Sequence, residues 1–234
     1  MKVGLIGYGK MGKAIEEILV ERGHEVVLKI SHTPSIEEVK ELDVAIEFSR
    51  PEYAFENLSV LLKAGIPTIC GTTGWLEQLP EIENITTANN TAFLYASNFS
   101  LGVNLFFELN QQLAKMMNRY RNEYNIHLEE IHHTQKLDAP SGTAITIAEG
   151  IINQTTYDTW SMKQNGETII PIEAKRIEDV PGTHIVKYTS NVDTIEISHT
   201  AHNRKGFALG AVIAAEWIAD KHGIFTMKDV LELN

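Results

Sequence analysis

The feature that most constrains this chain is a glycine-rich turn that begins at residue 7. The turn matches the pattern G-x-G-x-x-G through Gly7, Tyr8, Gly9, Lys10, Met11 and Gly12. It follows an apolar run over 3–6 and opens an amphipathic helical pattern over 11–19, which is the context that the pattern requires. The first glycine permits a tight turn, the second lets backbone approach a pyrophosphate, and the third lets helix and strand pack closely. The turn therefore predicts a dinucleotide-binding domain, with a tight strand-to-helix turn that binds nothing as the alternative.

The first hundred residues alternate short β-branched runs with helical patterns. Further strands are expected over 25–30, 44–48, 67–70 and 91–96. Ser49 is a candidate N-cap for the helix that follows the third strand. Such alternation predicts an α/β fold, a Rossmann-like doubly wound parallel sheet covered on both faces.

The pattern changes near residue 100. One long amphipathic helix is predicted over 103–120. Strand-like segments follow over 124–131, 167–172, 184–189 and 194–199, and a final helix is predicted over 207–220. Strands grouped in this way predict a second, α+β domain built on a mostly antiparallel sheet. We expect the dinucleotide-binding domain over 1–103, completed by a C-terminal helix in 204–234, and the second domain over 104–203.

Composition narrows the range of partners. The chain has 31 acidic and 20 basic side chains and a formal net charge of −11, so nucleic acid is a poor candidate. Its apolar runs fall short of the ~20 residues that a membrane span requires, and the N-terminus does not resemble a signal peptide. A single cysteine, Cys70, excludes an internal disulfide and is expected to be a buried, inert thiol. These features indicate a cytoplasmic protein without a membrane partner.

Two further loops follow expected strand ends, where open α/β sheets bind ligands. One contains Gly71, Thr72 and Thr73, and the other contains Ala96, Ser97, Asn98 and Phe99. Each could be an ordinary turn, but two such loops at the expected edge favour a ligand site.

The end of the second strand bears on the choice of cofactor. The stretch 29–33 has no acidic residue for the ribose 2′-hydroxyl of NADH, and Lys29 could instead accept a 2′-phosphate. This favours NADPH over NADH, with a solvent-facing Lys29 as the alternative.

A basic cluster stands out from this acidic chain. His132, His133 and Lys136 lie within five residues. Histidine titrates at about 6.5 and lysine at about 10.4, so the cluster can exchange protons near neutral pH. On a regular strand His132 and His133 would face opposite ways, so both can serve one site only if the strand ends or twists there.

An anion site is expected directly after this cluster. Ser141 is a candidate N-cap, which would leave the N–H groups of Gly142 and Thr143 free at a helix start. Together with the cluster they would form a receptor for a small dicarboxylate, facing the nicotinamide across an interdomain cleft. The alternatives are a solvated strand end with a surface lysine, or a zinc site, for which no third ligand stands at a recognisable spacing. We therefore predict no metal.

At these residues the sequence resembles the family of 4-hydroxy-tetrahydrodipicolinate reductases, also called dihydrodipicolinate reductases, of bacterial lysine and diaminopimelate synthesis. Residues 130–144 meet the pattern E-x-H-H-x-x-K-x-D-A-P-S-G-T-A. The stretches 48–51, 71–74, 98–104 and 199–211 are also similar to that family. Three departures concern the cofactor: a glycine turn one residue shorter, an abbreviated stretch over 31–43, and the missing acid near Lys29.

The resemblance implies an activity. It implies NADPH- or NADH-dependent reduction of 4-hydroxy-tetrahydrodipicolinate to tetrahydrodipicolinate, with loss of water and hydride transfer to C4 of the cyclic imine. The cofactor would lie on residues 7–12, 71–73 and 96–99. His132 would be a proton donor and acceptor, Lys136 a proton donor and His133 a substrate contact, while Gly142 and Thr143 would hold a carboxylate. The resemblance further implies a homotetramer joined through the sheets of the second domain, which would therefore serve both substrate binding and oligomerisation.

Two other functions compete with this hypothesis. One is another two-domain oxidoreductase that acts on an amino or keto acid, which has no need for His132, His133 and Lys136 together. The other is a non-catalytic NAD(P)-sensing module, in which the second domain serves only assembly. Turnover of the reduced cofactor with the cyclic substrate separates these possibilities.

Overall fold

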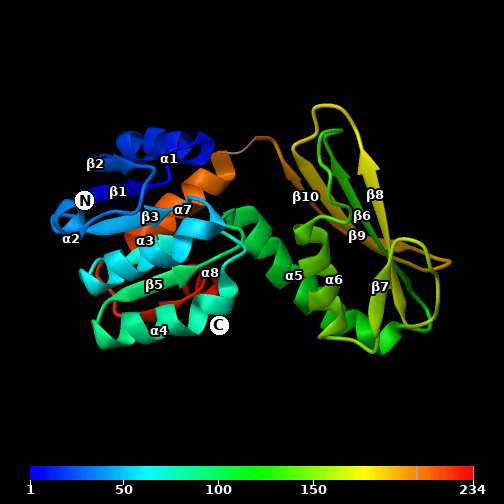
Figure 1. The fold of residues 1–234 in the computed structure, drawn as a ribbon. Helices are drawn as coiled ribbons and strands as arrows, with labels where there is room; N and C mark the ends of the chain where they lie inside the picture. The colour runs from blue at the N-terminus through cyan, green and yellow to red at the C-terminus, as the bar shows by residue number, and fades with distance from the viewer. Residues whose placement is uncertain (204, 234) are drawn as a thin grey trace. The chain divides into compact units, whose positions relative to one another are not determined.

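A computed structural model describes residues 1–203 and 205–233. The chain divides into two units, one made of Met1–Leu101 with the segment from Lys205 onward and one that starts at Gly102 and ends before that segment (Figure 1). Arg204, which belongs to the stretch similar to the reductase family, and Asn234 lie outside the described residues.

The first unit is built on a six-stranded sheet in the order β11-β5-β4-β3-β1-β2. All neighbouring strands in it are parallel. The strands are β1 (Lys2–Ile6), β2 (Glu25–Ile30), β3 (Val44–Glu47), β4 (Thr68–Cys70), β5 (Ala92–Tyr95) and β11 (Gly223–Phe225). The central strands are buried on both faces, which explains their nearly continuous apolar sequences.

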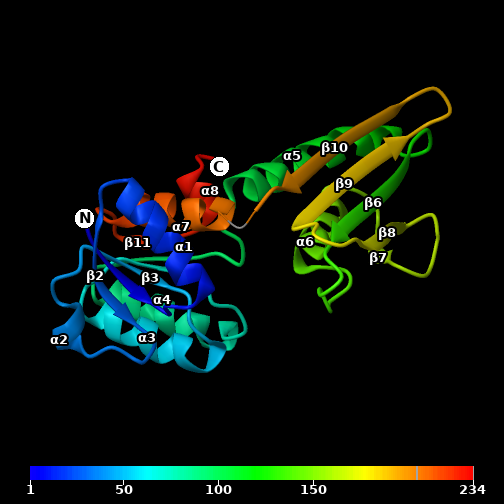
Figure 2. The ribbon, with the colours of Figure 1, turned by 90° about the horizontal axis from the view of Figure 1, so that it is seen from above.

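Helices cover both faces of this sheet, as Figure 2 shows. Ile15 and Leu19 of α1 share a core with Ala211 and Ala215 of α7, whereas α3 and α4 pack with Phe93 in a separate core. The doubly wound prediction is therefore confirmed. The helices of this unit are α1 (Lys10–Glu21), α2 (Ile36–Val39), α3 (Pro51–Lys63), the 3₁₀ turn η1 (Leu76–Gln78), α4 (Leu79–Ala88), α7 (Lys205–Ile218) and α8 (Met227–Val230).

The end of the chain holds the helix that we expected over 207–220, together with elements that we did not expect. Helix α7 stops at Ile218, and β11 then adds a sixth strand beside β5 before the short helix α8. Gly223, with a φ of 130°, provides the backbone conformation at which this strand begins.

The second unit is built on a five-stranded sheet in the order β10-β9-β6-β8-β7. Its strands are β6 (Asn125–His132), β7 (Thr159–Ser161), β8 (Ile169–Arg176), β9 (Gly182–Thr189) and β10 (Thr194–Ala201). The α+β class is confirmed, but the sheet is mixed rather than mostly antiparallel. Strand β9 is antiparallel to β6 and β10, whereas β8 is parallel to β6 and β7. The helix α6 (Gly142–Ile152) returns the chain to the end of the sheet at which β6 began, so the next long strand is parallel to β6.

One face of this sheet packs against α6 and the long helix α5 (Leu101–Met117), which the 3₁₀ turn η2 (Asn118–Tyr120) follows. Along β6, alternate side chains are buried, beginning with Ile126 and Leu128. Glu130 and His132 continue the same alternation, so two ionisable side chains occupy core-facing positions at the end of the strand.

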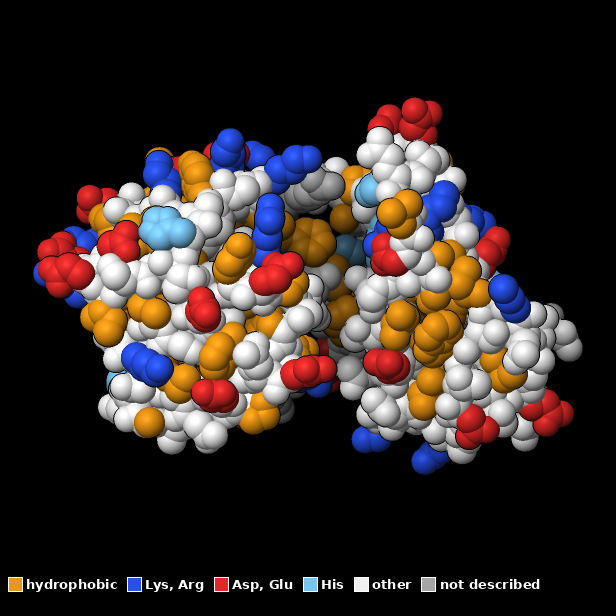
Figure 3. All heavy atoms as spheres, in the orientation of Figure 1, with side chains coloured by type: hydrophobic (Ala, Val, Ile, Leu, Met, Phe, Trp, Pro, Cys, Tyr) orange, Lys and Arg blue, Asp and Glu red, His pale blue; other side chains and the backbone are white. Residues whose placement is uncertain are grey.

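Charged side chains of both signs are interspersed on the face of the molecule drawn in Figure 3. Among the described residues, every helix is too short or too polar to cross a lipid bilayer.

Candidate active site

The predicted basic cluster lies where β6 ends. The strand stops at His132, and the chain turns at His133, whose carbonyl accepts a hydrogen bond from the Lys136 N–H. His132 is 9% exposed, and its ring lies against Gly182, where an added Cβ would be 2.9 Å from His132 Cε1. His133 is half-buried, and its Nδ1 has no hydrogen-bond partner among the described residues. The strand therefore ends where the sequence required it to end if both imidazoles are to serve one site.

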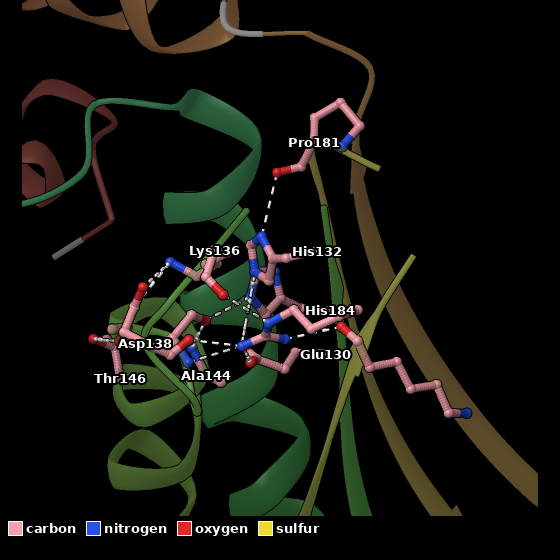
Figure 4. Close-up of polar contacts among 12 residues, drawn as sticks. Glu130, His132, Lys136, Asp138, Ala144, Thr146, Pro181 and His184 are labelled. Atoms are coloured by element: carbon pink, nitrogen blue, oxygen red, sulfur yellow. Dashed lines mark hydrogen bonds and ion pairs between the residues drawn. The ribbon is translucent and has the colours of Figure 1, made fainter. Parts of the chain in front are cut away.

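Glu130 forms the buried centre of the site. Its Oε1 accepts a hydrogen bond from Arg176 Nη2 at 3.1 Å, and its Oε2 accepts one from the Ser141 N–H at 2.9 Å (Figure 4). The side chain is fully buried, which alone would raise its pKa, but the hydrogen bonds from Ser141 and Arg176 outweigh burial and lower the pKa of Glu130. Glu130 is therefore a buried anion that ties β6 to α6 and β8.

Arg176 shapes the loop that carries Lys136. Its Nη2 also donates to the Asp138 carbonyl at 2.6 Å, and its Nε donates to the Lys136 carbonyl at 3.3 Å. The Lys136 ammonium donates to both carboxylate oxygens of Asp138, at 2.9 and 2.8 Å. This hydrogen bond lowers the pKa of Asp138. A single guanidinium thus fixes both the buried Glu130 and the loop on which Lys136 stands.

The surroundings of His132 lower the pKa of its imidazole below that of a free histidine. Burial lowers the pKa of His132, the carboxylate of Glu130 opposes that effect, and the positive charges of Lys136 and Arg176 lower the pKa further. Figure 4 draws the side chains of His132 and Lys136 in the same cluster, with the Lys136 ammonium directed at Asp138. The structure thus brings together the two residues predicted to exchange protons.

Helix α6 begins beside this cluster. Ser141 is its N-cap, as predicted, because the Ser141 Oγ accepts a hydrogen bond from the Ala144 N–H at 3.1 Å. Gly142 and Thr143 are the first two helical residues, so their N–H groups have no partner within the helix. Gly142 is exposed, with open space where a Cβ would lie. The start of α6 therefore offers two N–H donors and a helix dipole to an anion.

His184 and Arg176 are site residues that the sequence analysis missed. His184 lies on β9, about fifty residues from the cluster, and its Nε2 is 3.4 Å from His132 Nε2. Burial, followed by the charge of His132, lowers the pKa of His184 to about 4. No local pattern marks either residue, because each reaches the site only through strand pairing in the sheet.

Glu130, His132 and His184 lie close enough together to be considered as a metal site. Both oxygens of Glu130 already accept hydrogen bonds from the protein, and His132 Nδ1 lies 3.3 Å from the Pro181 carbonyl. These contacts describe a hydrogen-bond network rather than a set of ligands that face a common ion.

The predicted cofactor loops lie in the first unit, at the carboxyl edge of its sheet. The order of strands reverses between β1 and β3, which is where doubly wound sheets bind nucleotides. Gly7 has a φ of 99°, and an added Cβ would lie 2.0 Å from the Phe48 carbonyl oxygen. At Gly12, an added Cβ would lie 2.5 Å from the Gly7 carbonyl oxygen. Close backbone packing therefore requires glycine at both positions, in agreement with the G-x-G-x-x-G pattern.

The start of α1 is open to a ligand. Gly9 is the N-cap and makes no side-chain capping hydrogen bond, and an added Cβ there would meet open space. Lys10 and Met11 begin the helix. The uncapped N–H groups of this first turn suit a pyrophosphate, so the turn fits a dinucleotide.

The other two predicted loops lie at the same edge, after β4 and β5. Gly71 packs against the ring of Phe48, and the Thr72 Oγ1 accepts a hydrogen bond from the Ser49 N–H at 2.8 Å. Thr73 is exposed. Ala96 and Phe99 are buried, and the Phe99 ring lies 5.5 Å from the ring of Phe48. The loop that contains Phe48 and Ser49 therefore lies at the same edge of the sheet as the two predicted loops.

Ser49 was wrongly predicted as a helix cap. The N-cap of α3 is Arg50, and the Ser49 hydroxyl instead donates to the buried carboxylate of Glu47. Cys70 Sγ lies 3.2 Å from the same carboxylate. Burial, followed by the charge of Glu47, raises the pKa of the Cys70 thiol, which agrees with the expected inert thiol.

Lys29, which was predicted to contact the adenosine ribose of the cofactor, forms an ion pair with Glu16. Its Nζ donates to Glu16 Oε1 at 3.0 Å and lies 5.3 Å from the centre of the Tyr8 ring. The Tyr8 hydroxyl donates to Glu16 as well. Glu16, on α1 one turn beyond the glycine loop, thus places a carboxylate beside the end of β2.

A hollow of about 580 Å³ lies elsewhere in the second unit, between the starts of β6 and β8. Arg121 and Tyr157 are among the residues that line it, and none of the predicted site residues does so. It therefore lies at the opposite end of β6 from His132.

The fold and the two sets of residues define a class of protein. A doubly wound sheet with a glycine fingerprint, joined to a second unit that carries proton-exchanging groups beside a helix start, is typical of two-domain, dinucleotide-dependent oxidoreductases. Comparison with family models then identifies the family. Residues 1–99 match the model described as dihydrodipicolinate reductase, N-terminus, and residues 102–231 match that described as dihydrodipicolinate reductase, C-terminus. The chain belongs to the dihydrodipicolinate reductase family, which confirms the resemblance found in the sequence.

Individual relatives agree with this assignment. A protein of Christiangramia forsetii named 4-hydroxy-tetrahydrodipicolinate reductase is 53% identical over 99% of this chain and 98% of its own length. One of the same name from Methanosarcina barkeri is 37% identical over 96% of this chain and 82% of its own length. Among solved structures, the dipicolinate-bound dihydrodipicolinate reductase of Paenisporosarcina sp. TG-14 has the same fold, with a TM-score of 0.77, 20% identity and 97% coverage of both chains.

Proposed function

We propose that this protein reduces 4-hydroxy-tetrahydrodipicolinate to tetrahydrodipicolinate, with loss of water, at the expense of NADPH or NADH. The observation that carries this proposal is the cluster of His132, Lys136 and the open start of α6. These groups offer an imidazole, an ammonium and two N–H donors to one small anion. The names of the two curated relatives and the dipicolinate bound in the solved relative support the choice of substrate.

Each group has a role that follows from its surroundings. The N–H groups of Gly142 and Thr143 would hold one substrate carboxylate, and His133, with an unpartnered Nδ1, would contact the substrate. Lys136, whose ammonium Asp138 holds at this end of the loop, would donate a proton. His132 would give or take a proton at a lowered pKa.

A reduced nicotinamide, when bound on the glycine turn and the loops at 71–73 and 96–99, supplies the hydride to C4 of the imine. Tyr8, Ser97 and Asn98 belong to the same proposed cofactor surface. The tight packing at Gly7 and Gly12 and the open helix start at Gly9 support this placement.

Steady-state kinetics with both cofactors and freshly generated cyclic substrate test the proposal. We expect oxidation of reduced nicotinamide in equal amount to the tetrahydrodipicolinate formed. Oxidation that needs an amino or keto acid instead would identify a different oxidoreductase, and cofactor binding without turnover of any of these compounds would identify a sensor.

We propose a preference for NADPH, based on Lys29. A 2′-phosphate would compete with Glu16 for the Lys29 ammonium, and Glu16 would repel the phosphate while favouring the free 2′-hydroxyl of NADH. Glu16 therefore moderates the preference that Lys29 creates.

Two substitutions at this pair are expected to move the cofactor ratio in opposite directions. Lys29→Glu should lower the ratio of kcat/KM for NADPH to that for NADH by ~5-fold or more, and Glu16→Gln should raise it. The Lys29 side chain is exposed and that of Glu16 is half-buried, so folding should be little affected. Lys13→Gln, on the same helix as Glu16, is the control and should leave the ratio unchanged. Unchanged ratios in both test variants would show that Lys29 and Glu16 do not distinguish NADPH from NADH.

We further propose a cytoplasmic homotetramer joined through the sheet of the second unit. The helices α5 and α6 pack on one face of that sheet, and the outward side chains of β10 are exposed or half-buried, which supports a role for the other face in assembly. Sedimentation should give four times the mass of the chain, and a monomer at micromolar concentration would contradict this assembly.

A further inference from the structure

His184 lies between the catalytic imidazole and the start of α6. Its Nε2 is 3.4 Å from His132 Nε2 and 3.2 Å from the Ser141 Oγ, and the two imidazole rings meet edge to face at 5.1 Å (Figure 4). The side chain is 4% exposed, and its Nδ1 is buried without a hydrogen-bond partner among the described residues. The same Nε2 lies 3.9 Å from Glu130 Oε2, so one nitrogen of His184 faces His132, Ser141 and Glu130, which all belong to the proposed site.

The partners of His132 fix the position of its proton. Its Nδ1 lies 3.3 Å from the Pro181 carbonyl, which can only accept, so the neutral ring carries its proton on Nδ1. His132 Nε2 then has a lone pair directed at His184. Two imidazole nitrogens can form a hydrogen bond only when one of them carries the proton, so that proton must belong to His184 Nε2.

The contacts of Ser141 are compatible with this assignment. The Ser141 N–H donates to Glu130 Oε2 at 2.9 Å, and the Ser141 Oγ accepts a hydrogen bond from the Ala144 N–H at 3.1 Å. A hydroxyl oxygen has a second lone pair, so the Ser141 Oγ, 3.2 Å from His184 Nε2, can also accept the proton of that nitrogen. His184, whose burial keeps it neutral, must carry its proton on Nε2, and the bare Nδ1 is the atom left without a partner.

We propose that His184 is a positioning residue for the reaction. Its Nε2–H is shared by His132 Nε2 and the Ser141 Oγ, and it fixes the position of the catalytic imidazole relative to the helix start that receives the substrate carboxylate. This role rests on the proposed function. It also makes His184 a donor to the neutral form of His132, which disfavours protonation of His132.

Loss of this donor should change the titration of His132 in a defined direction. The charged and titratable groups that face His132 are Glu130 on the same strand, Lys136 on the following loop, Arg176 on β8 and His184 on β9. His199 on β10 acts on His184. Only the contact with His184 is removed by a substitution at 184, so the pKa of His132 should rise.

The test compares His184→Leu, which removes the donor, with His184→Gln, which retains an N–H donor at a similar reach. We expect His184→Leu to lower kcat/KM for the cyclic substrate by ~10-fold or more and to move the limb of the pH profile governed by His132 to higher pH. His184→Gln should restore most of the rate and the original limb. Cofactor affinity should stay unchanged in both, and His127→Gln at the exposed start of β6 is the control. Equal losses in the two variants, or an unmoved limb in His184→Leu, would overturn the proposal.

A second readout does not depend on turnover. Nitrogen NMR of the imidazoles in the unliganded protein should show neutral His184 protonated at Nε2 and neutral His132 protonated at Nδ1. The opposite tautomer at His184 would overturn the proposal even in an active enzyme. Absence of turnover in the wild type, with these tautomers present, would instead count against the proposed function while leaving the contact between the rings established.

Discussion

Replacing Lys136 by alanine is expected to lower kcat for the cyclic substrate by ~10²-fold or more while leaving NADPH affinity nearly unchanged. Lys136 supplies the ammonium next to His132, and its removal takes away a proton donor together with a positive charge that suits a dicarboxylate. The proposed cofactor loops lie in the first unit, whereas Lys136 belongs to the second. Stopped-flow and steady-state kinetics separate the rate of the chemical step from the binding of the cofactor.

His132→Ala is expected to produce a loss of similar size. Because the two residues act in one proton-exchanging group, the double variant should lose much less than the product of the two single losses. Lys163→Ala, at an exposed position just after β7, serves as the matched control and should retain full activity. A rate similar to that of the wild type in Lys136→Ala or His132→Ala would remove that residue from the mechanism.

The largest effect on stability is expected from Arg176→Met. The variant keeps much of the side-chain volume but leaves the fully buried carboxylate of Glu130 without its cation. Breaking a buried ion pair from one side costs about 3–5 kcal/mol. We expect a decrease of about 3 kcal/mol in the free energy of unfolding, at the low end because the Ser141 N–H still binds Glu130 and Arg176 is partly exposed. Urea unfolding at neutral pH measures this change.

The pH dependence of the same experiment identifies the cause. The folded state lowers the pKa of Glu130, so the ionised group stabilises the fold above its unfolded pKa and loses that effect as the pH falls through the folded pKa. Without Arg176, burial should raise the pKa of Glu130, so the deficit of the variant should shrink on acidification. Lys175→Met, at the adjacent residue, is the control: the Lys175 side chain is 40% exposed and its partner Glu129 is not fully buried, so the loss of stability should be smaller. An Arg176→Met variant as stable as this control would contradict the account of Glu130.

The sequence was most informative where a pattern is local. The glycine turn, the strands of the first unit and the Ser141 cap depend on neighbouring residues, and each was predicted at or near its observed position. The segment 130–144 was recognised for the same reason, since its chemistry lies within one strand end, one loop and one helix start. The structure adds that Glu130 and His132 lie on the core-facing side of β6, which follows from the alternation of that strand.

Features that depend on distant pairing were missed. His184 and Arg176 reach the site from β9 and β8, and nothing in their local sequence indicates that the sheet brings them to Glu130. The mixed order of the second sheet was missed because short strand patterns do not reveal direction, and the crossover by α6 decides it. Strand β11 was missed because it has only three residues, and β5 stabilises it by pairing. The pairing of Lys29 with Glu16 was missed because it joins β2 to α1 in the tertiary structure, whereas an acid was sought only at the end of β2.

We propose that residues 132–143 form the receptor for a cyclic dicarboxylate, and a crystal structure with dipicolinate and NADPH would show where the ligand binds. We expect one carboxylate to accept hydrogen bonds from the N–H groups of Gly142 and Thr143, with Lys136 and His133 within hydrogen-bond distance of the ligand. Dipicolinate bound at another surface, with the start of α6 free of any carboxylate at saturating ligand, would contradict the account.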